Sequence, residues 1–232
     1  MSSVSSIEMP FAFEEFLSMT DAGYRHQLAQ IALFDKKTIF WDEERKKKFA
    51  AIFYHLRGHF INFMWYLANF SPDPYTKKIV MENIHEELGT ESRFSHEMLY
   101  ERFANECGVD IKDEIVNETN YLPFARQFNK EHLRWLTEHD ADERLSAFAA
   151  YERLDNIDYP YLLEFAESLS LSPSATAFFR VHVHVEHFES TVEKLVPIWH
   201  ESEEKVKKSF AFIYNHQINM WRQLSDITFS SD

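Results

Sequence analysis

The chain has 232 residues, a formal net charge of −14 and a single cysteine. Such an acidic chain repels nucleic-acid phosphates and anionic membrane surfaces, so we expect neither as a partner. One cysteine allows no disulfide within the chain, which fits a reducing compartment. No apolar run reaches the ~18 residues of a membrane-spanning helix, and residues 1–10 lack the features of a signal peptide. These observations predict a cytoplasmic protein.

The composition favours helices over sheets. Phe occurs 22 times and aromatic residues make up 16% of the chain, whereas there are only four glycines. Aromatic side chains supply the area that a packed core buries, and scarce glycine disfavours the turns of sheets and barrels. We predict an all-α fold, a single-domain bundle of seven to nine helices over residues 11–232, after a flexible arm over residues 1–10. A homodimer is the default expectation for the oligomeric state.

Apolar periodicity and end signals place the helices along the chain. Apolar residues from Phe49 to Leu67 recur at spacings of three and four, which indicates one long helix over about residues 42–70. Asp73 and Pro74 begin the next helix, which ends near Gly89. The other helices are expected over about residues 20–34, 91–106, 121–138, 142–154, 159–169, 172–196 and 201–227.

The segment that follows the aromatic pair Phe178-Phe179 carries three groups able to bind a metal. On a helix, His182, Glu186 and Glu189 fall within about 60° of one another and so project from one face. A neutral imidazole and ionised carboxylates that converge in this way suit a metal ion, whose charge offsets the cost of desolvation. The alternative is a solvated polar stripe with one satisfied histidine.

Glu152 lies on the apolar stripe of its predicted helix, in line with Leu145, Phe148 and Ala149. A buried carboxylate is costly unless a cation, an arginine or a raised pKa compensates for it. Arg153 projects about 100° away from Glu152 and is an awkward partner. We interpret Glu152 as a further candidate ligand, with a salt bridge to another helix as the alternative.

A third cluster contains Glu86, Glu87, Gly89 and His96. On an unbroken helix, Glu86 and His96 would lie about 80° apart, so Gly89 must bend or end the helix if they share a site. The spacing to His96 favours Glu86 as the ligand, and the position relative to Gly89 favours Glu87. The alternative is an acid-rich helix end, which is common.

Taken in order, the three clusters resemble the heme-oxygenase-like diiron oxidases and oxygenases, helical proteins that bind no heme. The family pattern has a Glu before a Leu-Gly pair, a His seven to ten residues later, a lone Glu on a later helix, and finally His-x3-Asp-x2-His after an aromatic pair. The resemblance covers about residues 45–200, and the matching stretches are Glu86-Glu87-Leu88-Gly89 with His96, Tyr151-Glu152, and Phe178-Phe179 with His182, Glu186 and Glu189.

The resemblance implies a heme-oxygenase-like bundle that binds two Fe(II) ions and uses O₂ as co-substrate. One iron would be bound by Glu86 or Glu87, His96 and Glu152, and the other by His182, Glu186 and Glu189. This sequence has Glu186 where the family has Asp and Glu189 where it has the last His, so we expect the second iron to bind weakly. The alternative is that His187 supplies the missing imidazole, although on a helix it projects away from Glu186.

The resemblance also implies the reaction class, an iron-dependent oxidoreductase that acts on a small amine or amino acid. A narrower resemblance is to the nitrile synthase activity within this family, which converts a brominated tryptophan to an indole-3-carbonitrile. Two alternatives remain: a TenA-like hydrolase of a thiamine-type substrate, with Cys107 as nucleophile, and a metal-free helical binding protein. Nothing in the sequence near Cys107 would lower its pKa.

Overall fold

The computed structural model describes residues 8–35, 41–90, 94–184 and 188–230. These residues contain eleven α-helices, one 3-10 helix and no strand, which confirms the all-α, single-domain prediction. The elements are α1 (Phe11–Leu28), η1 (Ala32–Phe34), α2 (Glu43–Arg57), α3 (His59–Phe70), α4 (Pro74–Glu87), α5 (His96–Glu106), α6 (Ile111–Asn117), α7 (Pro123–Glu138), α8 (Ala141–Ser168), α9 (Ala177–Val183), α10 (Phe188–Glu201) and α11 (Glu203–Phe229). The expected flexible arm lies mostly outside the described residues.

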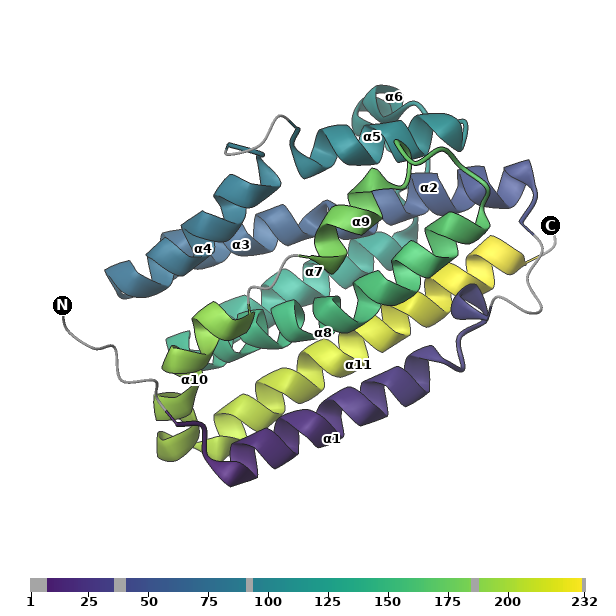
Figure 1. Ribbon diagram of the computed structural model, residues 1–232. Helices are drawn as coiled ribbons and strands as arrows, with labels where there is room; N and C mark the ends of the chain where they lie inside the picture. The colour runs from purple at the N-terminus through teal and green to yellow at the C-terminus, as the bar shows by residue number, and fades with distance from the viewer. Residues whose placement is uncertain (1–7, 36–40, 91–93, 185–187, 231–232) are drawn as a thin grey trace.

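Two long helices form the middle of the bundle. Figure 1 shows α8 and α11 running side by side, with α1 along α11 and with α4 and α5 on the other side of the molecule. The short helix α9 lies against both α8 and α5. The space between α8 and the α4–α5–α9 side is therefore bordered by several helices, and it is there that the candidate ligands meet.

Aromatic rings account for much of the core between α2 and its neighbours. Phe49 is fully buried, and its ring centroid lies 5.2 Å from that of Phe53, 4.6 Å from that of Phe165 and 6.3 Å from that of Phe103. Such offset and edge contacts each contribute about 0.5–1.5 kcal/mol beyond simple burial. The many Phe residues therefore pack α2 against neighbouring helices such as α5 and α8.

Helix boundaries differ from the prediction at two places beside the site. The helix expected over residues 42–70 is divided at Gly58 into α2 and α3. The two helices expected over residues 142–154 and 159–169 are one continuous helix, α8, which runs through Pro160. Proline removes one backbone donor but does not always end a helix when packing on both sides holds it. In the continuous helix, Glu152, Asp155 and Tyr159 lie on one face at spacings of three and four.

Other helix boundaries also differ from the prediction. The first helix begins at Phe11, well before the expected start at about residue 20. The helix expected over residues 172–196 is divided into α9 and α10, and residues 185–187 between them lie outside the described residues. The predicted start of α4 is confirmed, because the Asp73 carboxylate accepts the Thr76 N–H at 2.9 Å. No helix within the described residues is long and apolar enough to cross a bilayer.

Candidate metal centre

The turn between α4 and α5 brings two candidate ligands together. Glu87 is the last residue of α4 and His96 is the first residue of α5. Gly89 follows the end of α4 with a left-handed φ of 67°, and a Cβ placed there would meet the carbonyl oxygen of Phe94 at 2.5 Å. Only glycine fits this close approach without strain. The chain therefore folds back on itself, and His96 returns against Glu87.

His182 reaches the same point from α9. Its Nδ1 lies 2.7 Å from the carbonyl oxygen of Phe178. A carbonyl oxygen only accepts hydrogen bonds, so Nδ1 is the donor and Nε2 of the neutral ring carries a lone pair. Tyr159 stacks on the imidazole at a centroid distance of 4.1 Å and an interplanar angle of 13°. These contacts fix both the orientation and the tautomer of His182.

The three side chains form a compact group. Oε1 of Glu87 lies 2.9 Å from Nδ1 of His96 and 3.7 Å from Nε2 of His182. One ligand atom from each residue lies within 4.8 Å of the other two. In the described part of the chain, no other set of three His, Cys, Asp or Glu residues meets this condition.

Protonation in the group suits a cation. Burial by itself raises the pKa of Glu87, but the imidazoles of His182 and His96 outweigh it and hold that pKa well below its ordinary value. Burial lowers the pKa of His182. The carboxylate is therefore ionised and the His182 ring is neutral at pH 7.

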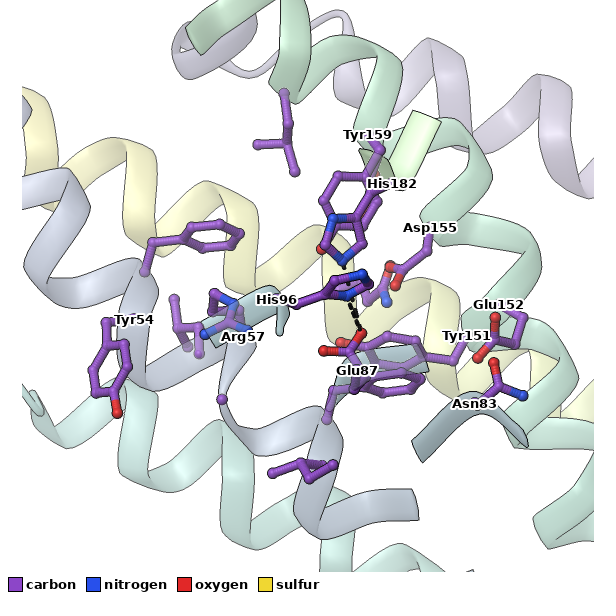
Figure 2. A pocket seen from close by; sticks show the side chains of 18 of the residues that line it. Tyr54, Arg57, Asn83, Glu87, His96, Tyr151, Glu152, Asp155, Tyr159 and His182 are labelled. Carbon is purple, nitrogen blue, oxygen red and sulfur yellow. Dashed lines mark hydrogen bonds and ion pairs between the residues drawn. The ribbon is translucent and has the colours of Figure 1, made fainter. Parts of the chain in front are cut away.

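A cavity of about 340 Å³ opens beside this group, within the size range of small-molecule sites. Figure 2 shows that Glu152, Asp155 and Tyr159 of α8 face the same cavity as Glu87 and His182. The rest of the wall is mainly aromatic and aliphatic, and includes Phe53, Phe60, Phe128, Tyr151, Leu162, Met220 and Trp221.

Four carboxyl groups line this cavity in addition to Glu97 at its edge: those of Glu87, Glu152, Asp155 and Asp158. Burial raises the pKa of Asp155 well above its ordinary value, and the negative charges of Asp158, Glu152 and Glu87 raise it further. Burial also raises the pKa of Asp158 to about 8. Buried carboxylates that repel one another in this way are stabilised when a cation binds between them.

A sequence-family model described as iron-containing redox enzyme matches residues 47–207 of this chain. The chain belongs to this family of iron-containing redox enzymes. The matched residues run from α2 into α11 and include every candidate ligand discussed above. The recognition made from the sequence motifs is thereby confirmed at the level of the family.

A solved structure shows the same fold. The crystal structure of a CADD-like protein of unknown function from Nostoc punctiforme PCC 73102 superposes with a TM-score of 0.72 at 16% sequence identity. The similarity covers 94% of this chain and 98% of the other. None of the curated proteins compared with this chain matches it.

The group formed by Glu87, His96 and His182 fits the iron that the family implies. Nε2 of His182 and the Glu87 carboxylate are both acceptors, and their 3.7 Å separation is too long for a hydrogen bond. Two facing acceptors are satisfied together by a cation placed between them. Imidazole and carboxylate are also the donor types that non-heme iron prefers.

The two adjacent glutamates, Glu86 and Glu87, have different surroundings. Glu87 lines the cavity, whereas Glu86 is exposed and is not part of the cavity wall. The side chains alternate in this way because residues i and i+1 on a helix project about 100° apart. The position relative to Gly89, rather than the ten-residue spacing to His96, is therefore the better guide to the candidate ligand.

The face expected to carry His182, Glu186 and Glu189 is not formed as one helix. Glu186 lies outside the described residues. Glu189 is in the first turn of α10, exposed to solvent, and does not line the cavity. The 60° argument assumed one unbroken helix, and the division between α9 and α10 removes that assumption. The roles of Glu186 and Glu189 stay predictions.

Glu152 is buried and lines the cavity, as its place on an apolar stripe indicated. Asp155 and Asp158 were missed. Asp155 and Asp158 lie three and six residues after Glu152, and this spacing would have found them had the two expected helices been joined. Arg57 was also missed, because it lies in a helix that was predicted from its apolar stripe alone, and no sequence motif marks it.

Cys107 lies away from this cavity. It is buried at the end of α5, and it is not part of the cavity wall. Burial raises the pKa of its thiol to about 12. A nucleophilic cysteine needs thiolate at working pH and access to substrate. The position of Cys107 therefore gives the TenA-like alternative no support.

Proposed function

We propose that this protein is a non-heme diiron enzyme that uses O₂ to oxidise a small amine or amino acid in the cavity beside α8. The observation that carries the proposal is the facing pair of acceptors, Nε2 of His182 and the carboxylate of Glu87, with His96 on the same carboxylate oxygen. Membership of an iron-containing redox family supports iron as the cation.

Charge supports two ions rather than one. Glu87, Glu152, Asp155 and Asp158 line the same cavity, and two divalent ions balance up to four carboxylates. Glu87, His96 and His182 would hold iron, and Glu152 and Asp155 are the carboxylates of α8 best placed to complete the site. Glu186 and Glu189 stay candidates for the second ion from the family resemblance.

Bound Fe(II) would supply the electrons that reduce O₂. The chain's own residues would position the substrate and keep water out. Apolar and aromatic side chains, among them Phe60, Tyr151 and Trp221, line most of the cavity. Burial and the neighbouring carboxylates raise the pKa of Asp155 well above its ordinary value, and a bound cation would favour its ionised form.

The finer proposal is an amino acid with an aromatic side chain, of the tryptophan type, and a nitrile as product. It is supported by the aromatic wall of the cavity and by the narrower resemblance noted from the sequence. The ring of such a substrate would pack on aromatic side chains, while its amine would lie toward the carboxylates of α8.

The test is O₂ consumption by protein loaded anaerobically with Fe(II) and then mixed with O₂. We expect uptake of O₂ to accelerate when an aromatic amino acid is present, and mass spectrometry to detect a product that has lost hydrogen. A Glu87→Gln variant should lose the acceleration. O₂ uptake that no amino acid or amine changes would contradict the proposed function.

A further inference from the structure

Arg57 brings a positive charge into a cavity whose other charged groups are mostly acidic. It is the last residue of α2, and its side chain is 9% exposed. Among the described residues that line the cavity, it is the only Lys or Arg. Burial by itself lowers the pKa of Arg57, but the negative charges of Glu97 and Glu87 outweigh it, so the guanidinium stays charged.

The guanidinium is held rigidly. Cζ of Arg57 lies 4.8 Å from the ring centroid of Tyr100 and 4.9 Å from that of Phe178. Nη1 donates to Oε2 of Glu97 at 2.8 Å. Cation–π contacts and an ion pair together restrict the rotamers of a long side chain, so the Arg57 side chain loses less conformational entropy when a ligand binds to it.

Most of its donors remain available. A guanidinium has five N–H groups, and among the described residues only the bond from Nη1 of Arg57 to Glu97 is made. The fully buried polar atoms that lack a hydrogen-bond partner include no nitrogen of Arg57. Arg57 is among the side chains that line the cavity (Figure 2), so we infer that these donors can reach a ligand bound there.

We propose that Arg57 binds the carboxylate of an amino-acid substrate, and so selects amino acids over the corresponding amines. The planar fork of Arg matches a carboxylate with two parallel hydrogen bonds. This inference rests on the proposed function, because it takes the cavity beside Glu87 as the substrate site.

The surrounding charges decide for an amino acid over other anions. A phosphate or a dicarboxylate would bring two negative charges close to Glu97, Glu87 and Asp155. An amino acid brings one, and its ammonium group is attracted to the same carboxylates. Arg57 would thus bind the carboxylate of the zwitterion, and the carboxylates of α8 would attract its ammonium group.

The probes are L-phenylalanine, 2-phenylethylamine and 3-phenylpropanoate, which share a ring and differ in their charged groups. Binding is measured by calorimetry, both with anaerobic Fe(II)-loaded protein and with metal-free protein. We expect L-phenylalanine to bind roughly tenfold or more tightly than 2-phenylethylamine. In Arg57→Gln this preference should disappear. A wild-type protein without the preference, or an Arg57→Gln variant that keeps it, would overturn the inference.

Two further variants separate recognition from structure. Arg153→Gln is the matched control, because Arg153 pairs with Asp21 and does not line the cavity; it should keep the preference. Glu97→Gln removes the partner of Arg57 but leaves the guanidinium, so the preference should be kept or strengthened. If Arg57 serves only to pair with Glu97, Glu97→Gln and Arg57→Gln will weaken the fold alike and neither will change the preference.

Iron binding is measured separately on the same samples. A preference that depends on Arg57 in a protein that takes up no iron would leave this inference intact and contradict the diiron function. Normal iron uptake, together with a preference for L-phenylalanine that does not depend on Arg57, would contradict this inference but not the diiron function.

Discussion

Nε2 of His182 faces Oε1 of Glu87 across 3.7 Å, while the opposite nitrogen of the same imidazole is held by the carbonyl oxygen of Phe178. The carbonyl fixes the proton on Nδ1, so two acceptors face each other in a largely buried space. An arrangement of this kind is typical of a metal ligand whose second nitrogen is anchored by a backbone carbonyl.

Removal of His182 should abolish metal-dependent stabilisation. We expect Fe(II), added without O₂, to raise the melting temperature of the wild-type protein relative to EDTA, because the metal binds the native state alone. His182→Ala should lose this rise. His184→Ala is the control, since His184 is exposed two residues further along the chain and should keep it. Equal shifts in both variants would show that the metal binds elsewhere.

Gly89 should be essential for the approach of His96 to Glu87. In Gly89→Ala, the new Cβ would meet the backbone of Phe94 and Ser95 at 2.5–2.7 Å, and φ of 67° strains any L side chain. We expect a loss of about 1–3 kcal/mol in unfolding free energy and weaker iron binding.

Gly23→Ala is the matched control for Gly89→Ala. Gly23 lies inside α1, and a Cβ there makes an ordinary 3.4 Å contact with Tyr214. This substitution should be neutral or stabilise the protein by up to about 1 kcal/mol. Chemical denaturation of both variants tests the difference, and a Gly89→Ala variant as stable as wild type would contradict the strain argument.

Asp158 should make the metal-free protein less stable as pH rises. Burial raises its pKa from 3.8 to about 8, so the folded state holds a proton that the unfolded chain has released. The cost of this group is absent below pH 3.8, grows from about pH 4 to 8, and is on the order of a few kcal/mol. Hydrogen bonds from Tyr24 and Trp221 to Oδ2 offset part of it.

Urea denaturation in EDTA at pH 5 and pH 8 measures this effect. We expect Asp158→Asn to be more stable relative to wild type at pH 8 than at pH 5, because the amide does not titrate. Glu87 does not interfere, since its pKa is lowered and its effect lies below pH 4.5. Burial lowers the pKa values of His59, His132 and His216, and these groups change stability in the opposite direction over part of this range, so the measured quantity is the difference between wild type and variant. A variant whose stability changes with pH as much as that of wild type would contradict the assignment.

Cys107 should be dispensable for catalysis. Its thiol is buried away from the cavity, and burial raises its pKa to about 12. Cys107→Ala should keep O₂ uptake and iron binding at wild-type levels, with a stability loss of about 1 kcal/mol from the lost sulfur volume. Loss of activity in a variant that still binds iron would revive the hydrolase alternative.

The fold class and the proximity of the first candidate ligands could be predicted from the sequence because both depend on local patterns. Apolar periodicity gives helices, and Gly89 after an acidic helix end marks a sharp turn. Glu152 was found because a carboxylate on an apolar stripe is anomalous by itself. These signals are read from a few neighbouring residues.

The remaining parts of the site depend on tertiary contacts. Packing keeps α8 helical through Pro160, and this continuity brings Asp155 and Asp158 into line with Glu152. Conversely, α9 ends at Val183, well before the end at about residue 196 that the residue spacing predicted. A periodicity argument gives the face that a helix buries, but it does not tell whether a helix continues past an expected end or stops before one.

The most direct test of the central claim is anaerobic Fe(II) titration of the metal-free protein, followed by metal analysis after desalting. The account predicts stoichiometric iron in wild type and in Glu86→Gln, and a loss of at least tenfold in affinity in Glu87→Gln, because only Glu87 faces His96 and His182. Wild-type protein that retains no iron, or a Glu87→Gln variant that binds iron as wild type does, would contradict it.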